Sequence, residues 1–84
     1  MKERTVTVGL SDGLDAGVIA TLVQQACRFE SKVYLQADGK KVNGKSIMGM
    51  MNMGVSKGGE ITILTEGPDE DMALDELEAF LGGK

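Results

Sequence analysis

Residues 32–54, KVYLQADGKKVNGKSIMGMMNMG, carry the pattern of a strand, a tight turn, a return strand and a short helix. In the first part apolar residues alternate with polar ones, which predicts a strand with one buried face; they are Val33, Leu35 and Ala37. Asp38-Gly39 is typical of a two-residue hairpin turn, because both central positions of that turn need positive φ. The residues from Lys40 to Asn43 then form the return strand.

The helix predicted next is short and almost wholly apolar. Ser46 is a preferred residue for opening a helix, since its hydroxyl accepts a bond from an unpaired backbone N–H, and Gly54 is a suitable stop. Relative to Ile47, Met51 lies at about 40° and Met48 at about 100° around the helix axis. Met50 and Met53 lie at about 300° and about 240°. The sequence therefore predicts two separate apolar faces.

A short helix on a small domain buries only one such face. The other is then an exposed surface of soft, adaptable side chains beside the hydroxyl of Ser46, which suits a docking surface. The alternative is a helix that is buried all round, with Ser46 acting as a plain cap.

The flanking segments complete a mixed fold. Alternating residues predict two more strands. The first contains Val6, Val8 and Leu10, and the last contains Ile61, Ile63 and Thr65. Leu64 lies on the opposite face of the last strand. Helical spacing predicts a helix from Ala16 to Arg28 capped by Asp15, and a final helix after Gly67-Pro68-Asp69, in which the aspartate caps. The buried positions of these helices are Ile19, Leu22, Val23 and Ala26, and Ala73, Leu74, Leu77 and Leu81.

The element order is therefore β-α-β-β-α-β-α over a single domain, residues 1–84. Four strands and helices long enough to cover one face predict an α+β fold, a two-layer open-faced sandwich. Its four-stranded antiparallel sheet carries all three helices on one side.

Composition excludes several classes of function. The chain has no histidine and one cysteine, so Ser-His-Asp and Cys-His catalysis, His-ligated metals and an internal disulfide are excluded. Cys27 has the spacing of a small core residue, and the acidic last helix is interpreted as a solvated face. A net charge of -4 argues against nucleic-acid binding as the main task. No signal peptide or membrane-length apolar run is present, so the cytoplasm is the default location.

Two further motifs have plainer interpretations. Residues 39–46, GKKVNGKS, match the spacing of a phosphate-binding loop, but here the motif spans a hairpin and its return strand instead of a strand-to-helix loop. Asp12 and Asp15 form a carboxylate pair in sequence, and the simpler interpretation is a turn residue and a helix cap.

The element order, the length and several motifs resemble the HPr family of small bacterial phosphocarriers, and most of all its Crh branch. The motifs are Gly13-Leu14, Phe29, Asp38-Gly39-Lys40-Lys41-Val42-Asn43, Lys45-Ser46-Ile47-Met48-Gly49 and Glu66-Gly67. In the phosphocarriers Gly-Leu is followed by His-x-Arg-Pro, whose histidine carries the phosphoryl group. Asp15, Gly17 and Val18 stand at the histidine, arginine and proline positions here. The resemblance thus implies a non-enzymatic protein without cofactors that does not relay phosphate for sugar transport.

For Ser46 the resemblance implies phosphorylation by HPr kinase/phosphorylase, followed by a corepressor role with a LacI-type catabolite control regulator. It places the partner-binding residues at Ile47, Met48 and Met51, with Lys45 in the adjoining basic segment, and it puts Met50 and Met53 in the core. Two alternatives remain: a diverged protein with another partner, and a carrier that uses Asp15 as phosphoacceptor. The two glycines of residues 9–13 suggest a hinge, so we expect a monomer with some strand-swapped dimer.

Overall fold

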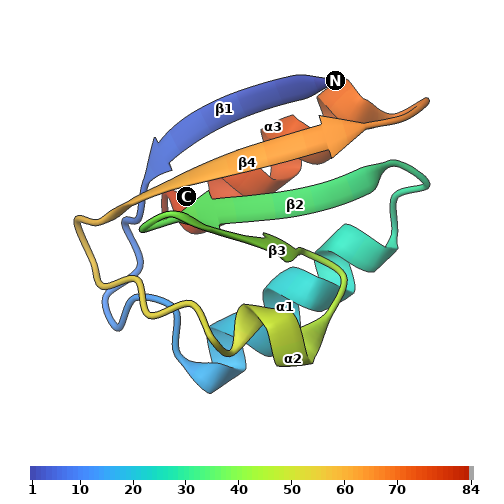
Figure 1. Ribbon diagram of the computed structural model, residues 1–84. Helices are drawn as coiled ribbons and strands as arrows, with labels where there is room; N and C mark the ends of the chain where they lie inside the picture. Colours follow the sequence, from blue (N-terminus) through green and yellow to red (C-terminus); the bar gives the residue numbers. More distant parts are fainter. Residues whose placement is uncertain (84) are drawn as a thin grey trace.

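The computed structural model describes residues 1–83 and shows a four-stranded antiparallel sheet with three helices packed against one side (Figure 1). The strands are β1 (Lys2–Thr7), β2 (Lys32–Ala37), β3 (Lys40–Asn43) and β4 (Glu60–Glu66), in the spatial order β1-β4-β2-β3. The helices are α1 (Ala16–Cys27), α2 (Ile47–Met50) and α3 (Glu70–Leu81). The predicted fold class, an α+β open-faced sandwich, is confirmed.

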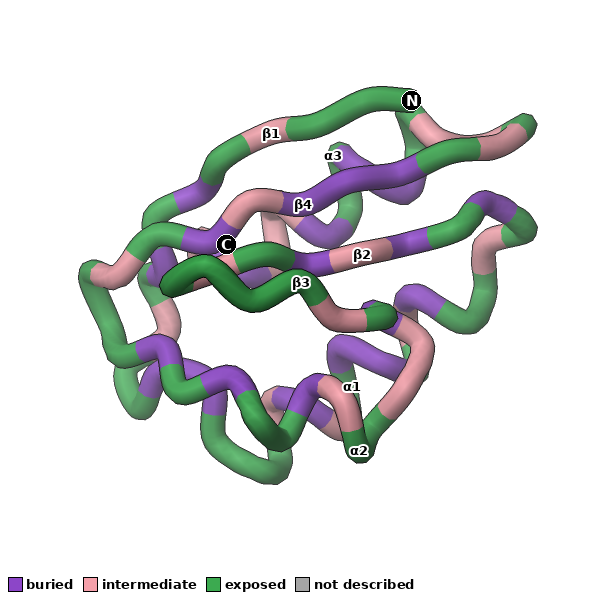
Figure 2. The backbone as a smooth tube through the Cα atoms, viewed as in Figure 1, coloured by how far each residue is buried: buried purple, intermediate pink, exposed green. Residues whose placement is uncertain are grey.

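The core lies between the sheet and the helices (Figure 2), where the predicted alternation is confirmed. Leu35 and Ile63 are directly paired across β2 and β4 and are both fully buried. Leu64 lies on the opposite face of β4, as predicted, beside Tyr34 of β2. With Phe29, Tyr34 and Phe80 as its only aromatic residues, the chain builds this core almost entirely from aliphatic side chains and methionine.

The turn between β2 and β3 has the backbone that its sequence requires. Asp38 has φ 52° and Gly39 has φ 77°, so both central residues are in the left-handed region. The register pairs Ala37 with Lys40 and Tyr34 with Asn43. This hairpin places the end of β3 directly before the segment that contains Ser46.

Two predictions of element detail are corrected. The first strand begins earlier than predicted and ends at Thr7, because Val8 instead exchanges backbone hydrogen bonds with the loop at Gly58 and Gly59. The helix at Ser46 ends at Met50, and residues 51–52 form a turn well before Gly54. The acidic face of α3 is exposed, as predicted, and Arg4 of β1 pairs there with Asp75 at 2.9 Å and Glu78 at 2.6 Å.

No helix within residues 1–83 is long and apolar enough to cross a membrane.

Candidate functional site

Ser46 lies at the N-cap of α2 with extended backbone angles, φ −115° and ψ 115°. Its hydroxyl oxygen accepts a hydrogen bond from the Gly49 N–H at 3.3 Å, and its carbonyl accepts from the Met50 N–H at 3.0 Å. The residue is half-buried, so solvent reaches it. Because the hydroxyl accepts from a backbone N–H at the start of a helix, negative charge at this position is favourable.

The apolar residues of α2 and of the turn that follows it divide into a buried and an exposed set, which are the two sets that the sequence predicts. Met50 and Met53 are 0% and 4% exposed and belong to the core. Ile47, Met48 and Met51 are 49%, 83% and 59% exposed. We call these three residues the methionine patch. The alternative of a helix buried all round is wrong.

The segment that leads into Ser46 is held at several points. The Gly44 N–H donates to the Val33 carbonyl at 2.8 Å, and the Lys45 N–H donates to the Asn43 side-chain oxygen at 2.8 Å. A Cβ at Gly44 would lie 2.7 Å from a methyl group of Val33, so only glycine fits there without a shift. The Lys45 ammonium donates to the Phe29 carbonyl at 2.7 Å, just beyond the end of α1.

At the start of α1, the Asp15 carboxylate accepts a hydrogen bond from the Val18 N–H at 2.8 Å and serves as the predicted cap. The adjoining Gly17 is exposed, and the nearest atom to a Cβ built there is an Asp15 carboxylate oxygen at 3.6 Å. Space for a larger side chain therefore exists at position 17. Asp12 lies in the exposed turn before α1, as its simpler interpretation predicted.

Among residues 1–83, the structure shows no group of three or more His, Cys, Asp or Glu side chains placed to hold a metal ion. The phosphate-loop motif of residues 39–46 also has the wrong context, because it runs through the hairpin turn and β3. Its first five residues lie in that turn and in β3, and only residues 44–46 connect the strand to α2, a helix of four residues.

Cys27 was predicted to be a core residue, and this is wrong: the thiol is free and the residue is exposed at the last position of α1. The buried stripe of α1 ends with Ala26, and Cys27 lies one residue further around the helix, about 100° away. The apolar character of cysteine gave no indication of which side of α1 faces the sheet.

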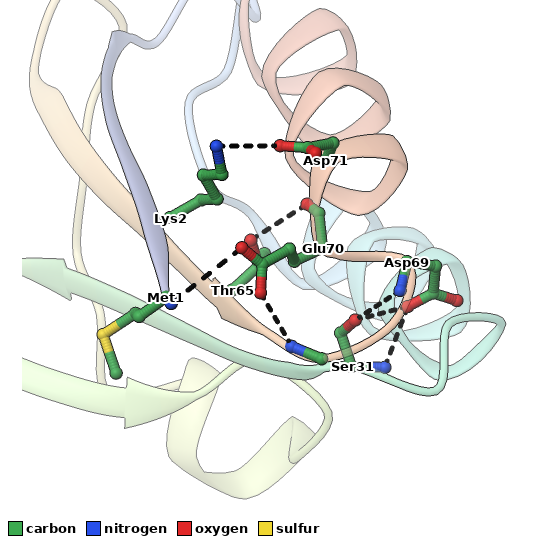
Figure 3. A network of polar contacts seen from close by, with 8 residues as sticks. Met1, Lys2, Ser31, Thr65, Asp69, Glu70 and Asp71 are labelled. Atoms are coloured by element: carbon green, nitrogen blue, oxygen red, sulfur yellow. Dashed lines mark hydrogen bonds and ion pairs between the residues drawn. The ribbon is translucent and has the colours of Figure 1, made fainter.

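A polar network missed by sequence reasoning joins the connection between α1 and β2 to the start of α3 (Figure 3). Asp69 was predicted to cap α3, but its carboxylate makes no capping bond to that helix. It accepts instead from the backbone N–H groups of Glu30 and Ser31, each at 3.0 Å, and from the Ser31 hydroxyl. The Ser31 hydroxyl bond, with the two amides, lowers the pKa of Asp69.

Glu70, the first residue of α3, bonds backward to the turn before the helix. Its carboxylate accepts from the Gly67 N–H at 3.0 Å, and the amino terminus of Met1 lies 3.9 Å from it. The partners of Asp69 are 38 and 39 residues distant in sequence, so no local signal identified them.

The comparisons with known proteins agree with this architecture. A family model described as "PTS HPr component phosphorylation site" matches residues 2–82. The chain is 48% identical over 81 residues to the HPr-like protein Crh of Halalkalibacterium halodurans, covering 96% of each chain. It is 49% identical over 81 residues to the HPr-like protein Crh of Bacillus subtilis, covering 96% of this chain and 95% of that one.

Solved structures of HPr and Crh proteins have the same fold as this chain. A crystal structure of the phosphocarrier protein HPr from Bacillus anthracis has a TM-score of 0.92 at 44% identity, covering 95% of each chain. A crystal structure of Bacillus subtilis Crh, described as a domain-swapped intertwined dimer, has a TM-score of 0.76 at 49% identity, covering 96% of this chain and 93% of that one. From its fold, its family match and these relatives, the chain belongs to the HPr family.

Proposed function

We propose that this protein is a non-catalytic regulator that HPr kinase/phosphorylase phosphorylates on Ser46, and that the phosphorylated form is a corepressor for a LacI-type catabolite control regulator. The observation that carries the proposal is that Ser46 is half-buried at the start of α2, next to the exposed residues Ile47, Met48 and Met51. One surface thus combines a modifiable hydroxyl with uncovered apolar side chains. The proposal places the protein in the cytoplasm, with its partners.

Phosphorylation changes the charge of this surface more than its shape. A phosphoserine adds about -1.5 to -2 charges and three acceptor oxygens at pH 7. At position 46 these oxygens meet the Gly49 N–H, which already donates to the hydroxyl, and the positive end of the α2 backbone. The local stabilisation is therefore modest, about 0.3–2 kcal/mol, and the protein needs no refolding to expose the methionine patch.

A partner distinguishes the two forms if it supplies two features together. Arginine or lysine side chains bind the phosphate through charge-assisted hydrogen bonds, and an apolar pocket receives the methionine patch. Methionine suits such a pocket because its unbranched side chain adapts to the shape of the opposite surface. Lys45, also predicted to contact the partner, already has its ammonium bonded to Phe29.

The first test is incubation with HPr kinase/phosphorylase and ATP, followed by intact-mass measurement. We expect one added phosphate on the wild-type chain and none on Ser46→Ala. Ser56→Ala is the matched control, because Ser56 is an exposed serine in the loop before β4, and it should accept phosphate normally. Phosphate that survives in Ser46→Ala, or no phosphate on the wild type, contradicts the proposal.

The second test measures regulator affinity for the phosphorylated and unphosphorylated forms. We expect binding only with phosphate, and weaker binding for Met48→Ala. A regulator that binds both forms equally contradicts the corepressor role. Equal binding would favour the alternative of a diverged protein with a different partner. That alternative is motivated by Gly17 and Val18, which replace the arginine and proline of the family.

The carrier alternative places the phosphoryl group on Asp15. That carboxylate is exposed at the start of α1, where it caps the helix. Mass measurement after exposure to a phosphoryl donor tests it: a phosphate lost in Asp15→Asn but kept in Ser46→Ala would establish the carrier.

We also propose that the protein is mainly a monomer that forms some dimer by exchange of β1. The support is the domain-swapped form described for Bacillus subtilis Crh and the position of β1 at an edge of the sheet, paired only with β4. The connection from β1 to α1 contains Gly9 and Gly13, and Gly13 has φ 64° in a tight turn.

A further inference from the structure

Lys45 differs from the other lysines of its region. The residues from Lys32 to Lys57 include five lysines, and four of them are exposed: Lys32, Lys40, Lys41 and Lys57. Lys45 is half-buried, and its ammonium donates to the Phe29 carbonyl at 2.7 Å across 16 residues of sequence. A charged group held in this way points toward the protein and is not simply part of a basic surface.

The acceptor lies beside the carbonyl end of α1. That helix ends at Cys27 with Arg28 as its cap, and the Phe29 N–H donates to the Ala26 carbonyl at 3.2 Å. The last turn of α1 contains no basic residue. A cation is favourable near a helix C-terminus, and here the Lys45 ammonium, from another element, lies beside the cap residue Arg28 and bonds a carbonyl just beyond it.

The backbone on either side of Lys45 is held by the hairpin. The Gly44 N–H is bonded to β2 through Val33, and Asn43 accepts from the N–H groups of both Lys45 and Ser46. The side chain of Lys45 adds the one hydrogen bond from residues 44–46 to the segment that directly follows α1. The start of α2 is therefore held by β2 on one side and by the backbone just after α1 on the other.

We infer that Lys45 is a positioning residue, whose ammonium joins the end of α1 to the start of α2 and so fixes the Ser46 cap and the methionine patch in one orientation. Its effect on a partner is indirect. It sets where Ile47, Met48 and Met51 point, while the charge that a partner reads comes from the modified serine. This consequence for docking rests on the proposed function; the placement of α2 by Lys45 does not.

The decisive experiment is amide hydrogen exchange by NMR on the unphosphorylated protein. The Met50 N–H reports on α2, because it donates to the Ser46 carbonyl at 3.0 Å. In Lys45→Met, which keeps the apolar stem but loses the ammonium, we expect Met50 protection to fall about fivefold, the effect of losing one net hydrogen bond. The Ile63 N–H in the central strand β4 reports on global stability and should change much less.

Two further variants make the result specific. Lys45→Arg keeps a donor and should restore most of the Met50 protection. Lys40→Met removes an exposed lysine of the same segment and should have no effect on α2. Unchanged Met50 protection in Lys45→Met, an equal loss at Met50 and Ile63, or no recovery in Lys45→Arg would each overturn the inference. The measurement needs neither kinase nor regulator, so its failure is distinguishable from failure of the proposed function.

Discussion

Ser31 and Asp69 bond each other in both directions across 38 residues of sequence. The Ser31 N–H and hydroxyl donate to the Asp69 carboxylate, and the Asp69 N–H donates to the Ser31 hydroxyl at 3.2 Å. Ser31 is 1% exposed, so its hydroxyl has little access to water and is satisfied within this pair. The pair fastens the start of β2 to the start of α3 (Figure 3).

The first prediction concerns pH. The pKa of Asp69 is lowered from its ordinary value of 3.8 chiefly by the Ser31 hydroxyl, so the folded state favours the ionised carboxylate. This stabilisation is fully present above pH 3.8 and is lost as the pH falls through the lowered pKa of the folded protein.

We expect Asp69→Asn to unfold at lower urea than the wild type at pH 7, and the difference to shrink steadily as the pH falls below 4. Urea denaturation of both proteins at several pH values measures this difference in stability. Asp12→Asn, in an exposed turn, is the control and should follow the wild type at pH 7. A difference between Asp69→Asn and wild type that does not depend on pH would contradict the role of the carboxylate charge.

The second prediction concerns the cap of α2. Ser46→Ala removes the acceptor of the Gly49 N–H and should destabilise the protein by about 0.5–2 kcal/mol. Ser46→Asp keeps an acceptor and adds a negative charge at the helix start, so its stability should stay close to that of the wild type. Thermal or urea denaturation of the three proteins tests this, and equal stability of Ser46→Ala and the wild type would show that the cap is unimportant.

The third prediction separates the two faces of the methionine helix. Met50 is 0% exposed, and Met50→Ala should lower the free energy of unfolding by about 2–5 kcal/mol. Met48 is 83% exposed, and Met48→Ala should change it by less than about 0.5 kcal/mol. In regulator binding the expectation for Met48→Ala is a clear loss of affinity. A Met48→Ala protein that is unstable, or that binds normally, would contradict the assignment of the faces.

The fourth prediction concerns a close backbone contact. Gly9 lies against the end of α3: its N–H donates to the Leu81 carbonyl at 2.9 Å, and a Cβ there would overlap the Gly82 carbonyl oxygen. Because the backbone at Gly9 and the end of α3 must move apart, Gly9→Ala should lower the free energy of unfolding by about 1–3 kcal/mol.

Gly54→Ala is the matched control for Gly9→Ala. A Cβ at Gly54 meets no described atom within 4 Å, and its φ is outside the left-handed region. Stability should therefore be unchanged or raised, by up to about 1 kcal/mol. Equal stabilities of the two variants would show that the backbone at Gly9 yields more easily than the contact indicates.

The fifth prediction concerns oligomeric state. After days at high concentration, light scattering should show mainly monomer with a minor dimer, because exchange of β1 keeps its pairing with β4 and changes only the connection of residues 9–13. Mixing two differently tagged copies should yield mixed dimers only on this slow timescale. A single monomer mass under all conditions would contradict the prediction of a strand-exchanged dimer.

Much of the fold follows from local sequence. The hairpin turn was predictable because its two central residues must adopt positive φ, and Asp38-Gly39 does so. The strands and helices were predictable from periods of two and 3.6 residues. Asp15 was identified as a cap because a capping bond spans only three residues, here to Val18.

The sequence by itself determined that the methionine helix has two apolar faces, since the angle between residues depends only on helix geometry. The packing of α2 beside α1 and β3 decided that Met50 is inside and Met48 outside. The family resemblance had implied this assignment, whereas helix geometry alone left both faces open. The side of α1 that is buried decided the exposure of Cys27, for which apolar character gave the wrong prediction.

The bonds of Lys45 to Phe29 and of Asp69 to Ser31 were also decided only by the tertiary structure. Lys45 and Phe29 are 16 residues apart in sequence, and Asp69 and Ser31 are 38 apart. From local sequence alone, Lys45 belonged to a basic segment and Asp69 was a helix cap. Propensity and periodicity act between residues a few positions apart. Which polar groups meet across the chain is set by how the helices pack on the sheet, because a buried hydrogen-bonding group must find its partner wherever the packing places one.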